Sequence, residues 1–249
     1  MLRIFRNIRQ KLAAENKVMA YLRYAIGEIL LVMIGILLAL QVNNWNEGRK
    51  QSELKTVYIS RLVSDIQQDI LNIQIIKKQT EEAQEIINNT IHILNTKSDL
   101  LKTMQVLEIY FEKGWDTRIF IANDNTYTDL LQTGNMSILK GNIEVENIIK
   151  YYASAKNSRE ADLGNENWVV SIDVSLTEKT SALEFDSVTR ELFKDKDKQI
   201  SIRDMIAHKE ILERSAAAHY WYNNSSLRRL TIIENEAQKL LQTLNSELE

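Results

Sequence analysis

Few residues in this chain have the type and spacing that metal binding or catalysis requires. Three histidines occur, His92, His208 and His219, and none stands at the helical spacing that puts two ligands on one face. Even if one helix ran through His208 and His219, their side chains would lie about 16 Å apart along its axis, too far for one metal ion. We therefore expect ordinary surface or core histidines, with no metal and no cofactor.

Catalytic signatures are equally scarce. The chain has no HExxH, phosphate-binding loop, Gly-rich dinucleotide turn or GxSxG. The segment NDNTYTDLLQTG at 123–134 begins like a calcium loop, but its sixth residue is Thr128 instead of glycine and its twelfth is Gly134 instead of glutamate. We reject a calcium site and expect no enzymatic activity. A hydrolase stays open as an alternative, because Asp/Glu pairs on adjacent helices leave no sequence signature.

Aromatic residues are the remaining candidates for a ligand site. Aromatic walls with polar tips suit a small-molecule pocket between helices. The residues that could line one are Tyr151, Tyr152, His219, Tyr220 and Trp221. The alternative is that these side chains only pack in the core and at interfaces.

Composition indicates long helices as the elements that position these residues. Proline and cysteine are absent and glycine occurs only seven times in 249 residues, so helix breakers are few. The absence of cysteine excludes disulfides and thiolate metal sites. Residues 1–42 carry six Lys/Arg against two Glu, which leaves 25 basic and 32 acidic residues beyond them. An acidic domain of this kind argues against nucleic acid as a partner.

One segment, from Tyr24 to Trp45, has the length and character of a transmembrane helix. Its stretch from Ile29 to Leu40 has no polar side chain, and 22 helical residues span about 33 Å, the thickness of a bilayer core. Aromatic residues stand at both ends, as at membrane interfaces. A cleaved signal peptide and a buried core helix are the alternatives, but no small-residue cleavage site and no polar face are present.

Basic residues predict the orientation of this span. Six Lys/Arg precede it and four follow within twenty residues, which places residues 1–22 in the cytoplasm and residues 46–249 outside, in a periplasm. Residues 1–22 also form an amphipathic pattern suited to anionic lipid. The basic residues that would face the lipid are Arg3, Arg6, Arg9 and Lys11. The alternative is that these charges only set the topology.

Three residues within the span share one helical face, namely Glu28, Gly35 and Ala39. A carboxylate in the membrane calls for a partner or a water path, and Gly35 with Ala39 would let a second helix approach closely. We therefore predict a packing face for a protein partner or a second copy. The alternative is that Glu28 extends to the nearby interface.

The remainder predicts an all-α fold: a transmembrane helix followed by an extramembrane multi-helix bundle with one long helix. After a hinge at 43–48, apolar residues recur at three- and four-residue steps from Glu53 to Asn95. Trp168 to Leu176 fits helix or strand, and we favour helix. Caps and glycines predict further boundaries: a helix from Ser98-Asp99 to Gly114, a helix from Thr126 to Gly134, one from Asn142 to Gly164, one capped by Ser201 after the loop 194–198, and one from Ser225.

Three blocks carry a family resemblance. They are FRNIRQKLAAENK (Phe5 to Lys17), YAIGEILLVMIGILLALQVNNWNE (Tyr24 to Glu47) and, more loosely, YTDLLQTGNMSIL (Tyr127 to Leu139) with IIKYY (Ile148 to Tyr152). In these blocks the chain resembles a family of uncharacterised single-pass membrane proteins, abundant in Bacteroidota and classed as a domain of unknown function. The resemblance implies the inner membrane of a Gram-negative bacterium, and it assigns no activity.

Two functions agree with these expectations. The first is a binding or assembly protein of the bacterial cell envelope, held beside its partner by the anchor. The second is a ligand sensor that acts through a partner membrane protein, because about 23 cytoplasmic residues leave no room for a kinase or transmitter domain. The sequence does not name the partner or the ligand.

Overall fold

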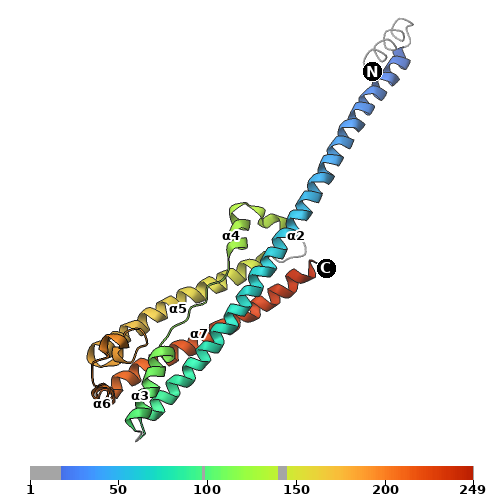
Figure 1. Ribbon diagram of the computed structural model, residues 1–249. Coiled ribbons are helices and arrows are strands. Elements are labelled where there is room, and N and C mark those ends of the chain that lie inside the picture. The colour runs from blue at the N-terminus through green and yellow to red at the C-terminus, as the bar shows by residue number, and fades with distance from the viewer. Residues whose placement is uncertain (1–17, 97–98, 140–144, 249) are drawn as a thin grey trace. The chain divides into compact units, whose positions relative to one another are not determined.

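The computed structural model describes residues 18–96, 99–139 and 145–248. All regular structure within these ranges is helical (Figure 1), which confirms the predicted all-α class. The chain divides into two compact units, Met1–Thr56 and Val57–Glu249. The α-helices are α2 (Val18–Leu94), α3 (Leu100–Ile109), α4 (Asn125–Gln132), α5 (Val145–Lys179), α6 (Lys198–Ala207) and α7 (Lys209–Ser246).

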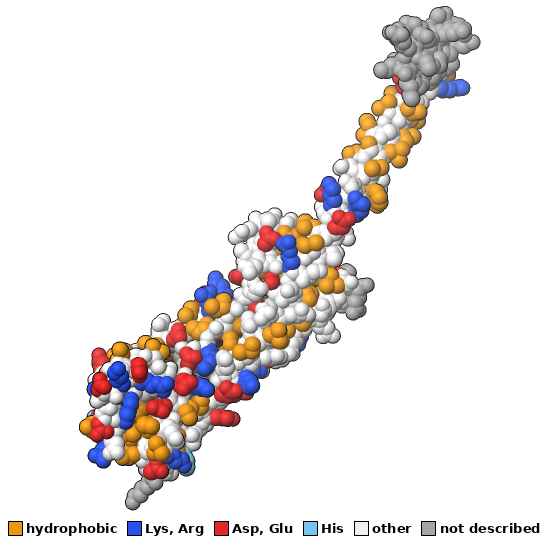
Figure 2. Space-filling model, viewed as in Figure 1, with side chains coloured by type: hydrophobic (Ala, Val, Ile, Leu, Met, Phe, Trp, Pro, Cys, Tyr) orange, Lys and Arg blue, Asp and Glu red, His pale blue; other side chains and the backbone are white. Residues whose placement is uncertain are grey.

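The first unit contains the N-terminal part of α2. An 18-residue window of this helix has a mean hydropathy of 2.4, and none of its side chains is buried; apolar side chains project along this stretch in Figure 2. α2 is therefore long and apolar enough to cross a membrane. The predicted hinge at 43–48 is wrong, because α2 continues through it without a break. Asn and Gly in a helix each cost no more than about 1 kcal/mol relative to Ala, which good helix formers on either side outweigh.

The second unit, Val57–Glu249, is a helical bundle built on α2, α5 and α7. Lys77 of α2 pairs with Glu234 of α7, whereas Asn95, just past the end of α2, bonds to Glu213 near the start of α7. These two helices are therefore antiparallel. α5 is also antiparallel to α7, since Lys150 pairs with Glu236, Asp162 with Arg229 and Asp173 with Ser215. It follows that α2 and α5 run in the same direction.

Apolar side chains fill the bundle in two main clusters. One lies towards the end at which α2 enters, and its buried members include Leu62, Ile66, Ile148 and Leu240. The other lies towards the far end, where Leu107, Phe111, Leu176 and Phe185 meet Leu212. Burying such side chains is the main stabilising term in the fold.

The part of the chain that joins α2 to α5 contains both helices and irregular structure. Asp99 caps the start of α3, because its side chain accepts from the Lys102 amide at 2.7 Å, so the predicted cap is confirmed. α3 continues into a π-helical turn, η1 (Tyr110–Gly114). Residues 116–124 then form neither helix nor strand and lead to α4. This stretch, hereafter the extended segment, is visible in Figure 1 as the green coil between α3 and α4.

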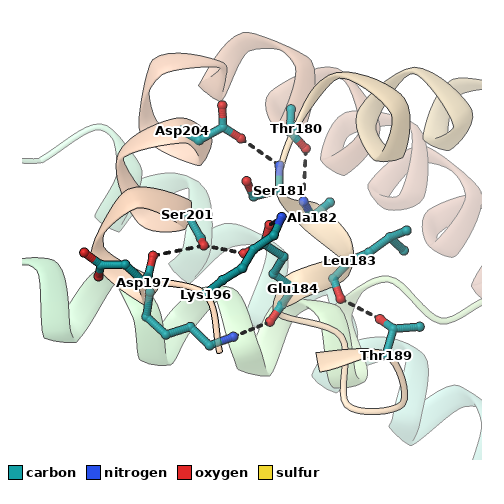
Figure 3. A network of polar contacts seen from close by, with 11 residues as sticks. Thr180, Ser181, Ala182, Leu183, Glu184, Thr189, Lys196, Asp197, Ser201 and Asp204 are labelled. Carbon is teal, nitrogen blue, oxygen red and sulfur yellow. Dashed lines mark hydrogen bonds and ion pairs between the residues drawn. The ribbon is translucent and has the colours of Figure 1, made fainter. Parts of the chain in front are cut away.

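The far end of the bundle is closed by η3 (Ala182–Glu184), η4 (Arg190–Phe193) and α6. Figure 3 shows how Glu184 joins them: its carboxylate accepts from Ser201 and, at 2.7 Å, from Lys196. The cap of α6 is Asp197, which accepts from the Gln199 amide at 2.9 Å. The predicted Ser201 cap is therefore wrong, because Ser201 lies inside α6 and is bound to Glu184.

Two other predicted boundaries also need correction. α5 passes through Gly164 without a break and α7 begins at Lys209 rather than at Ser225. Trp168 to Leu176 is helical, as favoured. The predicted start of α5 at Asn142 lies outside the described residues.

Candidate functional site

The extended segment creates the main polar site of the bundle, because its backbone groups need partners that helices normally supply internally. Asp65 and Asp69, one turn apart on α2, provide them. Asp69 accepts from the Asn123 backbone amide at 2.8 Å. Asp65 accepts from the Asn123 side-chain amide at 2.8 Å and from the Thr126 backbone amide at 3.4 Å.

The bond from the Thr126 amide to Asp65 caps the start of α4, although Asp65 lies on another helix, α2. Asp124 occupies the N-cap position of α4, but its side chain makes no capping bond. The first turn of a helix leaves backbone N–H groups without partners, and Asp65 satisfies one of them at Thr126. The predicted start of this helix at a Thr126 capping box is therefore wrong. The predicted Gly134 stop is confirmed, since Gly134 has a φ of 72°, a conformation that glycine adopts without strain.

Two tyrosines of α5 complete this polar site. We call it the polar junction, and it consists of Asp65, Asp69, Asn123, Tyr151 and Tyr152. The Tyr151 hydroxyl donates to Asp69 Oδ2 at 2.7 Å, and the Tyr152 hydroxyl donates to the Asn123 carbonyl at 3.3 Å. Burial raises the pKa of Asp69, and the hydrogen bonds from Asn123 and Tyr151 only partly oppose this rise. Burial likewise raises the pKa of both tyrosines far above the ordinary value, so both hydroxyls remain donors at physiological pH.

Beside this junction lies an open groove of about 540 Å³, hereafter the tyrosine groove. One wall is the stacked pair Tyr127 and Tyr152, whose ring centroids are 4.4 Å apart with 14° between the planes. Ile121 and Leu131 also line the groove, with 59% and 52% of their surface exposed. The charged side chains of the lining are two bases, Lys156 and Arg159, and one acid, Asp124. The lining therefore has one more basic than acidic residue, and the groove suits a group with an apolar body and a negative charge.

A second polar cluster, towards the far end of the bundle, contains serine, histidine and aspartate. His219 Nε2 lies 2.9 Å from Asp173 Oδ2, and the Ser215 hydroxyl donates to Asp173 Oδ1 at 2.6 Å. In a nucleophilic triad the serine bonds to the histidine, whereas here both bind the same carboxylate. His219 is only 1% exposed, with Trp115 packed edge-on against its ring. This cluster joins α5 to α7 and offers a substrate no access.

The five predicted aromatic residues therefore lie in different places. Tyr151 and Tyr152 belong to the junction, whereas His219 lies in the buried cluster of the far half. Tyr220 and Trp221 line a separate groove of about 470 Å³ between α2 and α7. No single cavity among the described residues includes all five. His92 and His208 do not belong to any candidate metal group in the part of the chain that the structure describes.

Comparison with known proteins identifies the family. A family of unknown function, DUF6090, matches residues 28–159, more than half of the chain. The chain belongs to the DUF6090 family. The DUF6090 match spans most of α2, all of α3 and α4, the extended segment and the first part of α5. It therefore contains every residue of the polar junction and of the tyrosine groove. Neither curated proteins nor solved structures gave a match.

The predicted membrane residues lie mainly at the start of the DUF6090 match or before it. Glu28, Gly35 and Ala39 all lie on α2, and an added Cβ at Gly35 would meet nothing within 4 Å. This face stays a prediction as a site for helix packing. The basic residues Arg3, Arg6, Arg9 and Lys11 lie outside the described residues.

Sequence reasoning missed Asp65, Asp69, Asn123 and the tyrosine groove within the DUF6090 match. A signal for Asp69 was present, because it stands seven residues after Leu62 and so on the inward face of the long helix. An acid on an inward face needs a buried partner. Nothing in the sequence indicated that this partner would be an extended segment more than fifty residues away.

Proposed function

We propose that this DUF6090 protein is a membrane-anchored binding or assembly protein of the bacterial cell envelope, acting by binding and not by catalysis. The tyrosine groove is the site at which it holds its partner. The observation that supports this proposal is a preorganised wall: Tyr152 is stacked on Tyr127 and hydrogen-bonded to Asn123. A surface fixed before binding loses little entropy when the partner arrives.

The lining of the groove indicates the chemistry of the partner. Ile121 and Leu131 are exposed apolar side chains beside the wall formed by Tyr127 and Tyr152, which favours an apolar residue of the partner. Lys156 and Arg159 favour a carboxylate close to that residue, because Arg binds carboxylates through two parallel N–H groups. We infer that the partner is a protein segment in which an aliphatic or aromatic residue adjoins Asp or Glu.

The proposal assigns residues 24–45 of α2 to the inner membrane, with the N-terminus in the cytoplasm and the bundle in the periplasm. It is supported by the apolar stretch of α2 and by the excess of basic residues before it. Arg3, Arg6, Arg9 and Lys11 would contact anionic lipid. Glu28, Gly35 and Ala39 would contact a membrane partner or a second copy.

A ligand sensor acting through a partner membrane protein is the second candidate, and one observation favours it. α2 has no break between Val18 and Leu94, and it carries both Asp65 and Asp69. A ligand that altered the polar junction would act directly on this helix. A thermal shift of the full chain with candidate small molecules, but without any co-purifying protein, would favour sensing.

The binding proposal can be tested by co-purification from native membranes. Leu131→Glu with Arg159→Glu adds acid to the groove, and we expect the doubly changed chain to lose its stoichiometric partner. Ile232→Glu is the control, because Ile232 is similarly exposed at 58% but lies on α7. The same partner recovered with both variants would rule out the groove as its site.

A further inference from the structure

The groove of about 470 Å³ between α2 and α7, hereafter the aromatic groove, has a lining that suits one kind of ligand. α7 contributes Glu213, Ala216, Ala217, Tyr220, Trp221 and Asn224, and residues between 87 and 91 of α2 form the other wall. The α7 residues recur at three- and four-residue steps, which keeps them on one side of the helix. None of them lines the tyrosine groove, so this site is separate and does not rest on the proposed function.

Two rings of the aromatic groove are open to a ligand. Tyr220 and Trp221 have 38% and 47% of their surface exposed. Ala216 and Ala217, one turn earlier on α7, are small and leave room beside the rings. Trp168 of α5 packs against Trp221 in an edge-to-face contact, with the ring centroids 5.3 Å apart and 76° between the planes. This contact positions the indole before a ligand arrives, which reduces the entropy lost on binding.

A carboxylate supplies the charge of the aromatic groove. Glu213 Oε1 accepts from the Asn95 side-chain amide at 3.0 Å, and the same amide nitrogen donates to the Ile91 carbonyl at 3.1 Å. Lys209 lies one turn before Glu213, but its ammonium group donates to Asn95 Oδ1 at 2.8 Å and lies outside the lining. Among the described residues that line the groove, Glu213 alone has a formal charge. The lining is therefore negative.

We propose that the aromatic groove binds a small molecule that carries a methylated ammonium group. The face of an aromatic ring has partial negative charge and attracts a cation that lies within about 6 Å of the ring centroid. A carboxylate attracts the same cation. Tyr220 and Trp221 supply the first attraction and Glu213 supplies the second, so one groove combines both.

The charge and size of the aromatic groove favour this ligand class over others. An anion would meet Glu213, and an apolar group would bury that carboxylate without a counter-charge, which is costly. A lysine side chain also brings a cation, but its ammonium group is compact and strongly hydrated, whereas methyl groups reduce hydration and pack against aromatic rings. A volume of about 470 Å³ lies within the range of small-molecule sites. Asn88 and Asn224, also in the lining, offer hydrogen bonds to the rest of the ligand.

Choline is the probe for this site, because it presents a quaternary ammonium group on a small body. The full chain, in a maltoside detergent that has no ammonium headgroup, is titrated with choline in a calorimeter. We expect saturable binding of choline and much weaker binding of its neutral analogue, in which carbon replaces the quaternary nitrogen and the shape is kept. Failure of choline to bind, or equal binding of the two compounds, would overturn the proposal.

Substitutions on α7 assign the binding to the aromatic groove. Trp221→Leu removes one ring, and we expect choline to bind about 2- to 30-fold more weakly, as the loss of one cation–π contact predicts. Tyr220→Leu tests the second ring in the same way, and Glu213→Gln should also weaken binding because it removes the charge. Glu210→Gln is the matched control, since Glu210 is an exposed acid of α7 outside the lining. Leu and Gln are good helix formers, and thermal unfolding checks that each variant folds.

Three results with these variants and probes would count against the proposal. Equal weakening by Glu213→Gln and Glu210→Gln would mean that choline is attracted to the acidic surface in general. Wild-type affinity in both Trp221→Leu and Tyr220→Leu would place the binding elsewhere. Tighter binding of Nα-acetyl-lysine methylamide than of choline would replace the small molecule with a lysine side chain of another protein.

Discussion

The Tyr151 hydroxyl donates a hydrogen bond to Asp69 Oδ2 over 2.7 Å, between residues 82 positions apart. Asp69 has no exposed surface, so this bond and the one from the Asn123 amide replace the water that the carboxylate loses on folding. The bond also fixes the axial register between α5 and α2. A shift of either helix along its axis would leave a buried polar group unpaired.

Removing this hydroxyl tests the energetic importance of the polar junction. Tyr151→Phe keeps the ring and leaves Asp69 with one donor fewer, and we expect the free energy of unfolding to fall by about 1–3 kcal/mol. Chemical denaturation of the full chain measures this loss. Tyr220→Phe is the control, since Tyr220 is 38% exposed and its hydroxyl has access to water. Equal stability of both variants would contradict the role of the bond.

The ion pair between buried Asp162 and partly exposed Arg229 provides a second test. Burial raises the pKa of Asp162, and the hydrogen bond and charge of Arg229 partly oppose this rise. Arg229→Met leaves the carboxylate without its counter-charge, and we expect a loss of about 3–5 kcal/mol. Adding Asp162→Leu removes the uncompensated charge and should restore much of the stability. A double variant as unstable as Arg229→Met alone would disprove this account.

Glu184 predicts a pH dependence at the far end of the bundle. Burial favours its neutral form, but bonds from Lys196 and Ser201 outweigh this effect, so the pKa is lowered from the ordinary 4.5. A lowered pKa gives stability that is present above pH 4.5 and lost as the pH falls through the folded-state value.

The matching experiment follows thermal unfolding of the wild type and Glu184→Gln from pH 7 to pH 3. We expect the variant to be less stable by about 1–3 kcal/mol at pH 7. Below pH 4.5 the two curves should converge, because the wild type is then losing the charge that the variant lacks. A constant difference between them across this range would show that the charge of Glu184 contributes nothing.

Alanine substitutions at two glycines should change the stability of the protein in opposite directions. A Cβ at Gly114 would lie 2.9 Å from Ile86 Cγ2 and 3.1 Å from Tyr110 Cδ2, so we expect Gly114→Ala to destabilise the bundle by about 1–3 kcal/mol. A Cβ at Gly164 would meet nothing within 4 Å. Gly164→Ala should therefore stabilise α5 by up to about 1 kcal/mol, the helix preference for alanine. Denaturation midpoints compare the two, and the same sign for both would refute the packing argument.

The helical architecture was predictable where local chemistry and packing agree. The long stripe from Ile59 onward faces the core as its spacing predicts. Asp99 caps the start of α3 and Gly134 follows the end of α4, both by local geometry. α7 was harder to read because several of its inward positions are polar. Ser215, His219 and Asn223 are buried, which hides the apolar period before Ser225.

The polar junction could not be predicted because its bonds join distant parts of the chain. Local patterns favoured Thr126 and Ser201 as caps, yet Asp65 supplies the bond at the first of these helices and Asp197 caps the second. The tyrosine groove has the same origin. Tyr127 and Tyr152 meet only after the extended segment has been fixed against α2.

The remote cap of α4 also has a consequence for the dynamics of the protein. α4 has eight residues and borrows its N-terminal acceptor from Asp65, 61 positions earlier. So short a helix does not persist alone in water. Its amides should therefore exchange with deuterium whenever the α2 contact opens. The tyrosine groove and the contact between α4 and α2 should therefore form and be lost together, as one cooperative unit.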